Sequence, residues 1–107
     1  MKRGEEKFVP EFKQAVLKYK LDDFLALTKI DPPSYVKIDV DGAEKQVLIG
    51  MENILRNNKL KKIFIELEEE GEVSTDCKNI IRKHGFNVES HKRVQNYFGL
   101  ENFIFSR

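Results

Sequence analysis

The chain alternates short apolar runs with amphipathic stretches after one strong break, and this order constrains its fold more than any other feature. The break lies at residues 31–34, where two consecutive prolines exclude helical geometry and remove amide donors. Residues 35–40 then alternate apolar and polar side chains up to an Asp-Gly pair, which predicts a strand followed by a turn. Residues 43–57 place apolar side chains at helical spacing, which predicts an amphipathic helix.

The rest of the chain continues the alternation. Residues 62–67 form a nearly continuous apolar run, which predicts a strand covered on both faces. Ser74 or Thr75 can cap a following helix, with His84 in its last turn and Gly85 as its stop. Residues 86–90 and 102–106 are typical of two closing strands.

This order predicts an α/β fold in which parallel strands with helices between them end in an antiparallel pair. Upstream of the break, residues 16–20 alternate enough to form a first strand. Asp22 can cap a short helix that runs toward Ile30.

Composition bounds the class of function. The 107 residues fit one domain, residues 1–107, and a net charge of +1 argues against a nucleic-acid partner. The chain contains no apolar run long enough for a membrane span or a secretion signal, so we expect a cytoplasmic protein with no membrane partner. Cys77 alone supports neither a disulfide nor a thiolate metal site, and its apolar helix face predicts a core position.

Acidic residues are densest around the first Asp-Gly turn, at Asp39, Asp41 and Glu44. In open parallel sheets ligands bind beyond the carboxyl ends of the strands, where this segment would lie. A structural role is also open, because Asp41 as N-cap with Glu44 three residues later is a capping box. Asp39 is not needed for such a cap and is the stronger candidate for chemistry.

A second acidic group follows the next predicted strand. Glu66, Glu68 and Glu70 alternate there, so they could meet Asp39 and Asp41 across neighbouring strands and hold a divalent cation. Solvent exposure explains the same pattern, and the ligand spacing is not diagnostic. A metal-dependent hydrolase is therefore one hypothesis, and a divalent ion should then shift the melting temperature.

Four segments of the chain form a recognisable set, namely Leu21-Asp22-Asp23-Phe24-Leu25, residues 35–44, Val47-Leu48-Ile49-Gly50 and Ile65-Glu66-Leu67-Glu68. Together they resemble the FkbM family of S-adenosylmethionine-dependent methyltransferases. That family carries an LDD helix start, a KIDVEGAE strand and turn, a vLxG run and a strand ending in IE. Within the main motif the chain differs from the family pattern only at Asp41, where glutamate is commoner. The negative charge is kept. The resemblance covers roughly residues 12–107.

The resemblance implies part of a Rossmann-like methyltransferase sheet, corresponding to the C-terminal portion of the family's domain. The family's glycine-rich turn for S-adenosylmethionine has no counterpart in this chain, whose glycines never fall in a Gly-x-Gly pattern. By resemblance, Asp39 and Asp41 line the pocket beside the transferred methyl group, with Asp39 contacting the cofactor. Glu66 faces the acceptor, a hydroxyl of a small molecule or glycan. O-methyl transfer is therefore implied, in a fragment expected to be inactive alone.

The same resemblance leaves one edge of the sheet without a partner. The strand ending at Asp39 would pair in a complete family member with a strand that this chain lacks. An apolar open edge favours pairing with another chain, so we predict a homodimer across it or a fold-back of residues 16–20. A non-catalytic α/β interaction or dimerisation module is the alternative function, and saturable binding of S-adenosylmethionine distinguishes the two.

Overall fold

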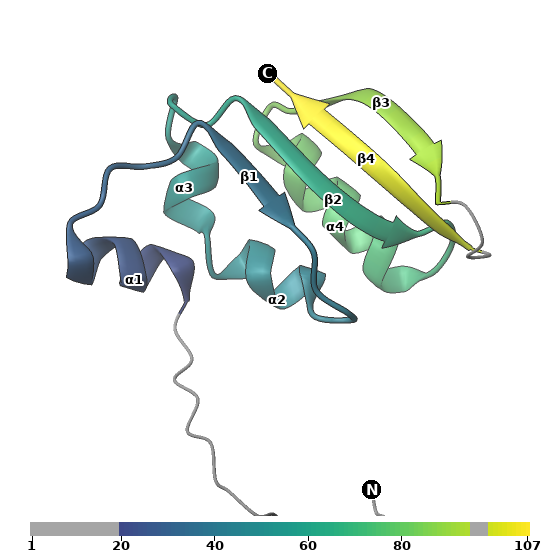
Figure 1. The fold of residues 1–107 in the computed structure, drawn as a ribbon, viewed down its shortest axis with the longest axis horizontal. Helices are drawn as coiled ribbons and strands as arrows, with labels where there is room; N and C mark the ends of the chain where they lie inside the picture. The colour runs from purple at the N-terminus through teal and green to yellow at the C-terminus, as the bar shows by residue number, and fades with distance from the viewer. Residues whose placement is uncertain (1–19, 95–98) are drawn as a thin grey trace, which may run out of the picture.

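A computed structural model describes residues 20–94 and 99–107 and shows an α/β fold (Figure 1). Four strands and four helices follow one another along this part of the chain. They are α1 (Leu21–Thr28), β1 (Tyr35–Ile38), α2 (Glu44–Ile49), α3 (Glu52–Arg56), β2 (Lys62–Glu68), α4 (Glu72–Lys83), β3 (Asn87–Arg93) and β4 (Leu100–Ser106). Within the described ranges, no helix has the length and apolar character needed to cross a membrane.

The strands form one sheet in the order β1-β2-β4-β3. β1 and β2 are parallel, with α2 and α3 between them in the chain, whereas β4 is antiparallel to both β2 and β3. The predicted parallel pair and closing antiparallel pair are confirmed. The predicted first strand at residues 16–20 falls outside the described residues apart from Lys20, which is not in a strand.

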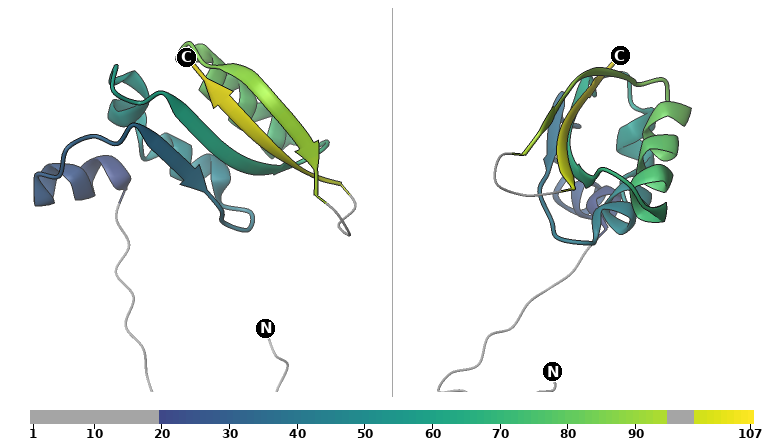
Figure 2. Two further views of the ribbon diagram at one scale, coloured as in Figure 1. Left: turned by 45° about the horizontal axis from the view of Figure 1, so that its top comes forward. Right: turned by 90° about the vertical axis from the view of Figure 1, so that its right-hand side faces the viewer.

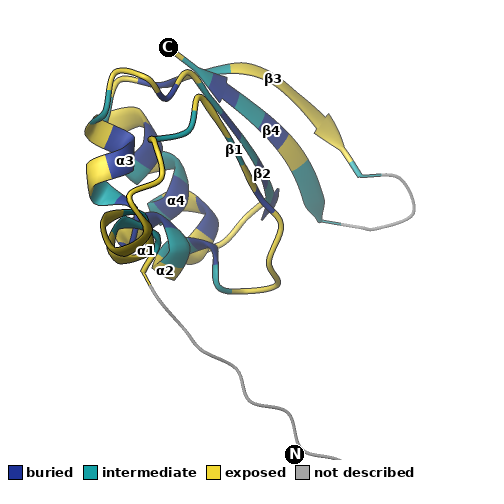
Figure 3. Ribbon diagram, turned by 60° about the vertical axis from the view of Figure 1, so that its left-hand side comes forward, coloured by how far each residue is buried: buried dark blue, intermediate teal, exposed yellow. Residues whose placement is uncertain are grey.

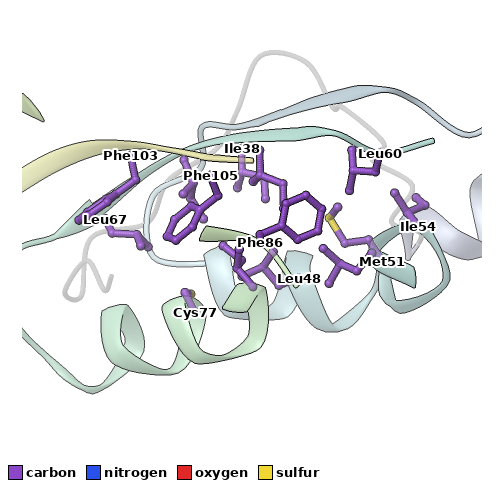
Figure 4. Packing of buried hydrophobic residues seen from close by; sticks show 14 residues of the cluster. Ile38, Leu48, Met51, Ile54, Leu60, Leu67, Cys77, Phe86, Phe103 and Phe105 are labelled. Carbon is purple, nitrogen blue, oxygen red and sulfur yellow. The ribbon is translucent and has the colours of Figure 1, made fainter. Parts of the chain in front are cut away.

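The core lies between the sheet and the helices α2, α3 and α4, which all pack on one face of the sheet (Figure 2). Alternation along β2 directs Ile63, Ile65 and Leu67 into this core. Aromatic side chains fill its centre, where Phe86 and Phe105 are fully buried between the sheet and the helices (Figure 4). The inner sides of the sheet and helices are buried, while β3 is exposed along most of its length (Figure 3). Cys77 is buried on α4, as predicted.

The predicted helix at residues 43–57 is two helices, so the single-helix prediction was wrong. α2 ends at Ile49 and α3 begins at Glu52, with Gly50 and Met51 between them. The cause is a tertiary contact with α1: the Gly50 carbonyl accepts a hydrogen bond from the Asp22 amide at 2.9 Å. A backbone group engaged outside the helix marks the point where the axis changes direction.

Asp22 does not cap α1, contrary to the prediction. It lies in the first turn of α1, whose N-cap is Lys20. Its carboxylate instead accepts hydrogen bonds from the amides of Asn53 and Ile54, at 2.8 and 3.2 Å. These amides belong to the first turn of α3, so Asp22 caps a helix that lies thirty residues further along the chain.

The start of α4 also differs from the prediction. The helix begins at Glu72 after Gly71, whose φ of 123° suits glycine, so neither Ser74 nor Thr75 is its N-cap. The Thr75 hydroxyl donates back to the Gly71 carbonyl at 3.0 Å, within the first turn. The predicted end is confirmed, because His84 is the C-cap and Gly85 follows with a φ of 94°.

Candidate active site

The ends of β1 and β2 bring two predicted site residues side by side. Ile38 is in register with Ile65 in the parallel pair, and each is followed directly by an acid, Asp39 and Glu66. Asp39 directly follows β1, and Glu66 lies two residues before the end of β2, so both acids lie near the carboxyl ends of the two parallel strands. The structure therefore places Asp39 and Glu66 together, as the sequence predicted.

Asp39 and Glu66 line the same cavity of about 350 Å³, which we call the strand-end cavity. It opens on the face of the sheet opposite the helices, because Glu66 alternates with the buried Ile65 and Leu67. Its wall is completed by residues of β1, β2 and β4, namely Lys37, Ile38, Phe64, Ile65, Asn102, Phe103 and Ile104.

A second cavity, of about 250 Å³, lies where the loop after β1 and the end of β2 meet the start of α4. We call it the acidic cavity. Its wall is formed by Asp41, Gly42, Glu44, Glu66, Leu67, Glu68, Val73, Ser74 and Leu100. Glu66 lines both cavities, so the two are adjacent.

The capping box predicted for Asp41 and Glu44 is not formed. α2 has Ala43 at its N-cap, without a side-chain cap. Glu44 nevertheless folds back, and its Oε2 accepts a hydrogen bond from the Gly42 amide at 3.2 Å. Glu44 is only 9% exposed, whereas Asp41 is exposed on the turn. Asp41 is therefore not the N-cap of α2, and its carboxylate is not needed for that structural role.

The carboxylates are not arranged as a metal centre. In the part of the chain that the structure describes, no group of three or more His, Cys, Asp or Glu side chains could hold a metal ion. Glu70 does not line either cavity and instead lies beside Glu68 and Glu69 at the turn after β2. The metal-dependent hydrolase that would use Asp39, Asp41 and Glu66 therefore gains no support from the described residues.

The histidines and the cysteine have structural surroundings. The Nδ1 atom of His84 lies 2.8 Å from the Ile80 carbonyl, and its Nε2 atom 3.3 Å from Glu52. His91 pairs with Glu101 at 2.5 Å. Burial raises the pKa of the Cys77 thiol to about 11, so it is protonated and a poor nucleophile at neutral pH.

Sequence reasoning missed Ser74 as a member of the site. It was interpreted as a helix cap, yet it lines the acidic cavity and is only 3% exposed. Its hydroxyl oxygen is buried and makes no hydrogen bond within the described residues. No spacing in the sequence marks this position, because the contact depends on how α4 packs against the end of β2. The signals for the acidic wall were the acidic residues around the Asp-Gly turn and the i, i+2 spacing of Glu66 and Glu68.

Comparison with known proteins identifies the family of the chain. No curated protein and no solved structure matches the chain. A family model described as the methyltransferase FkbM domain matches residues 4–99, which is most of the sequence and includes Asp39, Asp41 and Glu66. The chain belongs to the FkbM methyltransferase domain family.

Proposed function

We propose that this protein takes part in S-adenosylmethionine-dependent methylation of a hydroxyl on a small molecule or glycan. The observation that carries the proposal is that Asp39 and Glu66, which follow the in-register residues Ile38 and Ile65, line one cavity of about 350 Å³ near the carboxyl ends of β1 and β2. In α/β sheets this edge is where ligands bind. Family membership supplies the class of reaction.

The carboxylates suit one end of the cofactor. S-adenosylmethionine, when bound, supplies a methyl group on a positively charged sulfur, which is already activated for transfer. Asp39 and Asp41 offer negative charge to that cationic end, and we assign Asp39 as the contact. The glycines are too far apart in the sequence for a glycine-rich turn that would hold the adenosine. We therefore propose that the chain supplies the C-terminal, acceptor-side portion of a Rossmann-like domain and is inactive alone.

The residues of the strand-end cavity position and deprotonate the acceptor. Asp39 accepts the hydroxyl proton as the acceptor oxygen bonds to the methyl carbon and the bond from that carbon to sulfur breaks. Glu66 faces the acceptor from the neighbouring strand and orients it for in-line attack. Asp41, on the turn beyond β1, borders the same reaction site. The products are a methyl ether and the neutral thioether form of the cofactor.

The proposal is tested with the chain and with the product of its coding sequence extended upstream. We expect the extended product to transfer labelled methyl groups to polyol acceptors. In a calorimetric titration, its binding of S-adenosylmethionine should reach saturation. Asp39→Asn in that product should lower turnover by about 10²–10⁴-fold, the usual contribution of a general base. Asp31→Asn, an exposed aspartate before β1, is the matched control and should leave turnover unchanged.

Three outcomes separate the parts of the proposal. Turnover by the chain alone would disprove the inactive-portion assignment but leave the reaction intact. Unchanged turnover in Asp39→Asn would remove Asp39 from the mechanism. Absence of cofactor binding and of methyl transfer in both the chain and the extended product would disprove the function itself.

A further inference from the structure

The acidic cavity is lined by several acidic residues that have no part in the proposed proton transfer to Asp39. None of the described residues in its wall is basic, and four of them are acidic: Asp41, Glu44, Glu66 and Glu68. The nearby Lys45 forms an ion pair with Asp76, with 3.0 Å between Nζ and Oδ2, and does not line the cavity. A concave site with charges of one sign concentrates the electric field, so it favours a cationic ligand.

Ser74 provides a second observation, independent of the acidic residues, that points to a polar ligand at this cavity. Ser74 lines the cavity and is only 3% exposed, and its buried hydroxyl has no hydrogen-bond partner among the residues that the structure describes. The adjacent Thr75 in the same helical turn is paired, because it donates to the Gly71 carbonyl. Buried polar groups are nearly always satisfied, so an unpaired hydroxyl in a cavity wall indicates a polar group that binds there.

The acidic residues of this wall do not form a recognisable metal site. No three acidic side chains within the described ranges come together closely enough for a metal ion. They instead surround a cavity of about 250 Å³, just below the range of roughly 300–1,000 Å³ that is common for drug-sized ligands. The site therefore fits a small organic cation whose ammonium and hydroxyl groups reach several carboxylates and Ser74 separately.

We propose that the acidic cavity binds the ammonium group of a small amino-polyol, such as an amino sugar, through its carboxylates and the Ser74 hydroxyl. Glu66 lines both cavities, so the acidic cavity lies next to the strand-end cavity that Asp39 lines. The assignment of this ligand as the methyl acceptor rests on the proposed function. The binding of the ammonium group itself does not.

The test is calorimetric titration of the chain with glucosamine and, separately, with glucose at pH 7. The two sugars share the ring and differ in one ammonium group, so we expect glucosamine to bind at least about tenfold more tightly. Glu68→Gln and Ser74→Ala should each weaken glucosamine binding by about three- to tenfold. Glu72→Gln is the matched control, because Glu72 is exposed at the start of α4 and does not line the cavity.

A second measurement separates a binding role of Ser74 from a structural one. Its hydroxyl has no described partner in the free protein, so Ser74→Ala should leave the melting temperature of the free chain unchanged while weakening glucosamine binding. A Ser74→Ala variant that melts lower but binds glucosamine normally would overturn the assignment.

The remaining outcomes are also decisive. Equal binding of glucosamine and glucose, binding of neither, or equal effects of Glu68→Gln and Glu72→Gln would overturn the proposal. Displacement of glucosamine by S-adenosylhomocysteine would show that the cavity holds the ammonium group of the cofactor and not that of an acceptor. Selective glucosamine binding without methyl transfer in the extended product would leave this site standing while the proposed function fails.

Discussion

At the scale of single residues, Arg107 connects three parts of the fold. Its guanidinium group donates hydrogen bonds to the carbonyls of Leu55, Leu60 and His84, at 2.8, 3.1 and 2.8 Å, and also to the Asn57 carbonyl. The same group lies 4.2 Å from the centre of the buried Phe86 ring. One planar side chain therefore fixes the loop between α3 and β2 to the end of α4.

Replacing this guanidinium should be costly even when the charge is kept. Arg107→Lys leaves one ammonium group to serve several carbonyls, so we expect the free energy of unfolding to fall by about 2 kcal/mol. Urea denaturation measures this change. Arg56→Lys is the control, because Arg56 forms only an exposed pair with Glu52 and should change stability by less than about 0.5 kcal/mol. Equal effects of the two variants would contradict the role given to Arg107.

Glu52 makes stability depend on pH in the acidic range. The hydrogen bond from His84, followed by weaker effects of Arg56, lowers the pKa of the Glu52 carboxyl below its ordinary value of 4.5. A lowered pKa means that the carboxylate stabilises the folded state above about pH 4.5, and that this contribution is lost as the pH falls through the folded-state pKa.

We therefore expect Glu52→Gln to be less stable than the wild type at pH 7, with the difference narrowing below pH 4.5. Urea midpoints between pH 3 and pH 7 provide the measurement. Arg56→Gln should keep most of the pH dependence, because His84 is the larger cause of the shift. A Glu52→Gln profile parallel to that of the wild type would show that the pair with His84 has no energetic role.

At the scale of elements, the join between α2 and α3 depends on α1. Asp22 contacts both sides of the join, because its amide donates to the Gly50 carbonyl and its carboxylate accepts from the Asn53 and Ile54 amides. A Cβ added at Gly50 would lie 3.2 Å from the Lys20 Cβ, so the backbone of the join is close to the start of α1. The short helix α3 is thus stabilised by a residue outside it.

Removing this distant cap should destabilise α3 specifically. Asp22→Ala is expected to lower the free energy of unfolding by about 0.5–2 kcal/mol, the range for lost N-caps, and Asp22→Asn should recover part of it. Hydrogen exchange should show faster exchange at Asn53 and Ile54 before other amides. The neighbouring Asp23→Ala is the control, because Asp23 is exposed and makes neither of these bonds. Unchanged exchange at Asn53 and Ile54 in Asp22→Ala would disprove the cap.

The elements that could be predicted are those fixed by local pattern. Alternation in β2 and the order of strands and helices were sufficient for the parallel pair, the antiparallel pair and the position of Asp39 beside Glu66. The break at Gly50 and the cap from Asp22 depend on contacts between segments that are distant in sequence, so no local pattern encodes them. Ser74 was missed for the same reason, since its place in the acidic cavity arises only when α4 packs beside β2.

At the scale of the whole molecule, β1 is an edge strand whose outer side has no partner strand among the described residues. β1 pairs only with β2 among the strands of the described residues. The Ser34 carbonyl accepts from the Lys61 and Lys62 amides, so it points toward β2. Backbone groups alternate in direction along a strand, and the amides of Tyr35 and Lys37 therefore face the free edge. Tyr35 is 64% exposed.

We propose that two copies of the chain associate through this edge. Light scattering after size-exclusion chromatography should then give about twice the chain mass of 12.6 kDa. Lys37→Pro removes one edge-facing amide without touching the ladder to β2, so it should yield a folded monomer, whereas Lys37→Ala should remain a dimer. A wild-type monomer with fast-exchanging Tyr35 and Lys37 amides would exclude both the dimer and a fold-back of residues 16–20. A monomer with protected edge amides would favour the fold-back, because only a strand from the same chain could then supply the missing hydrogen bonds.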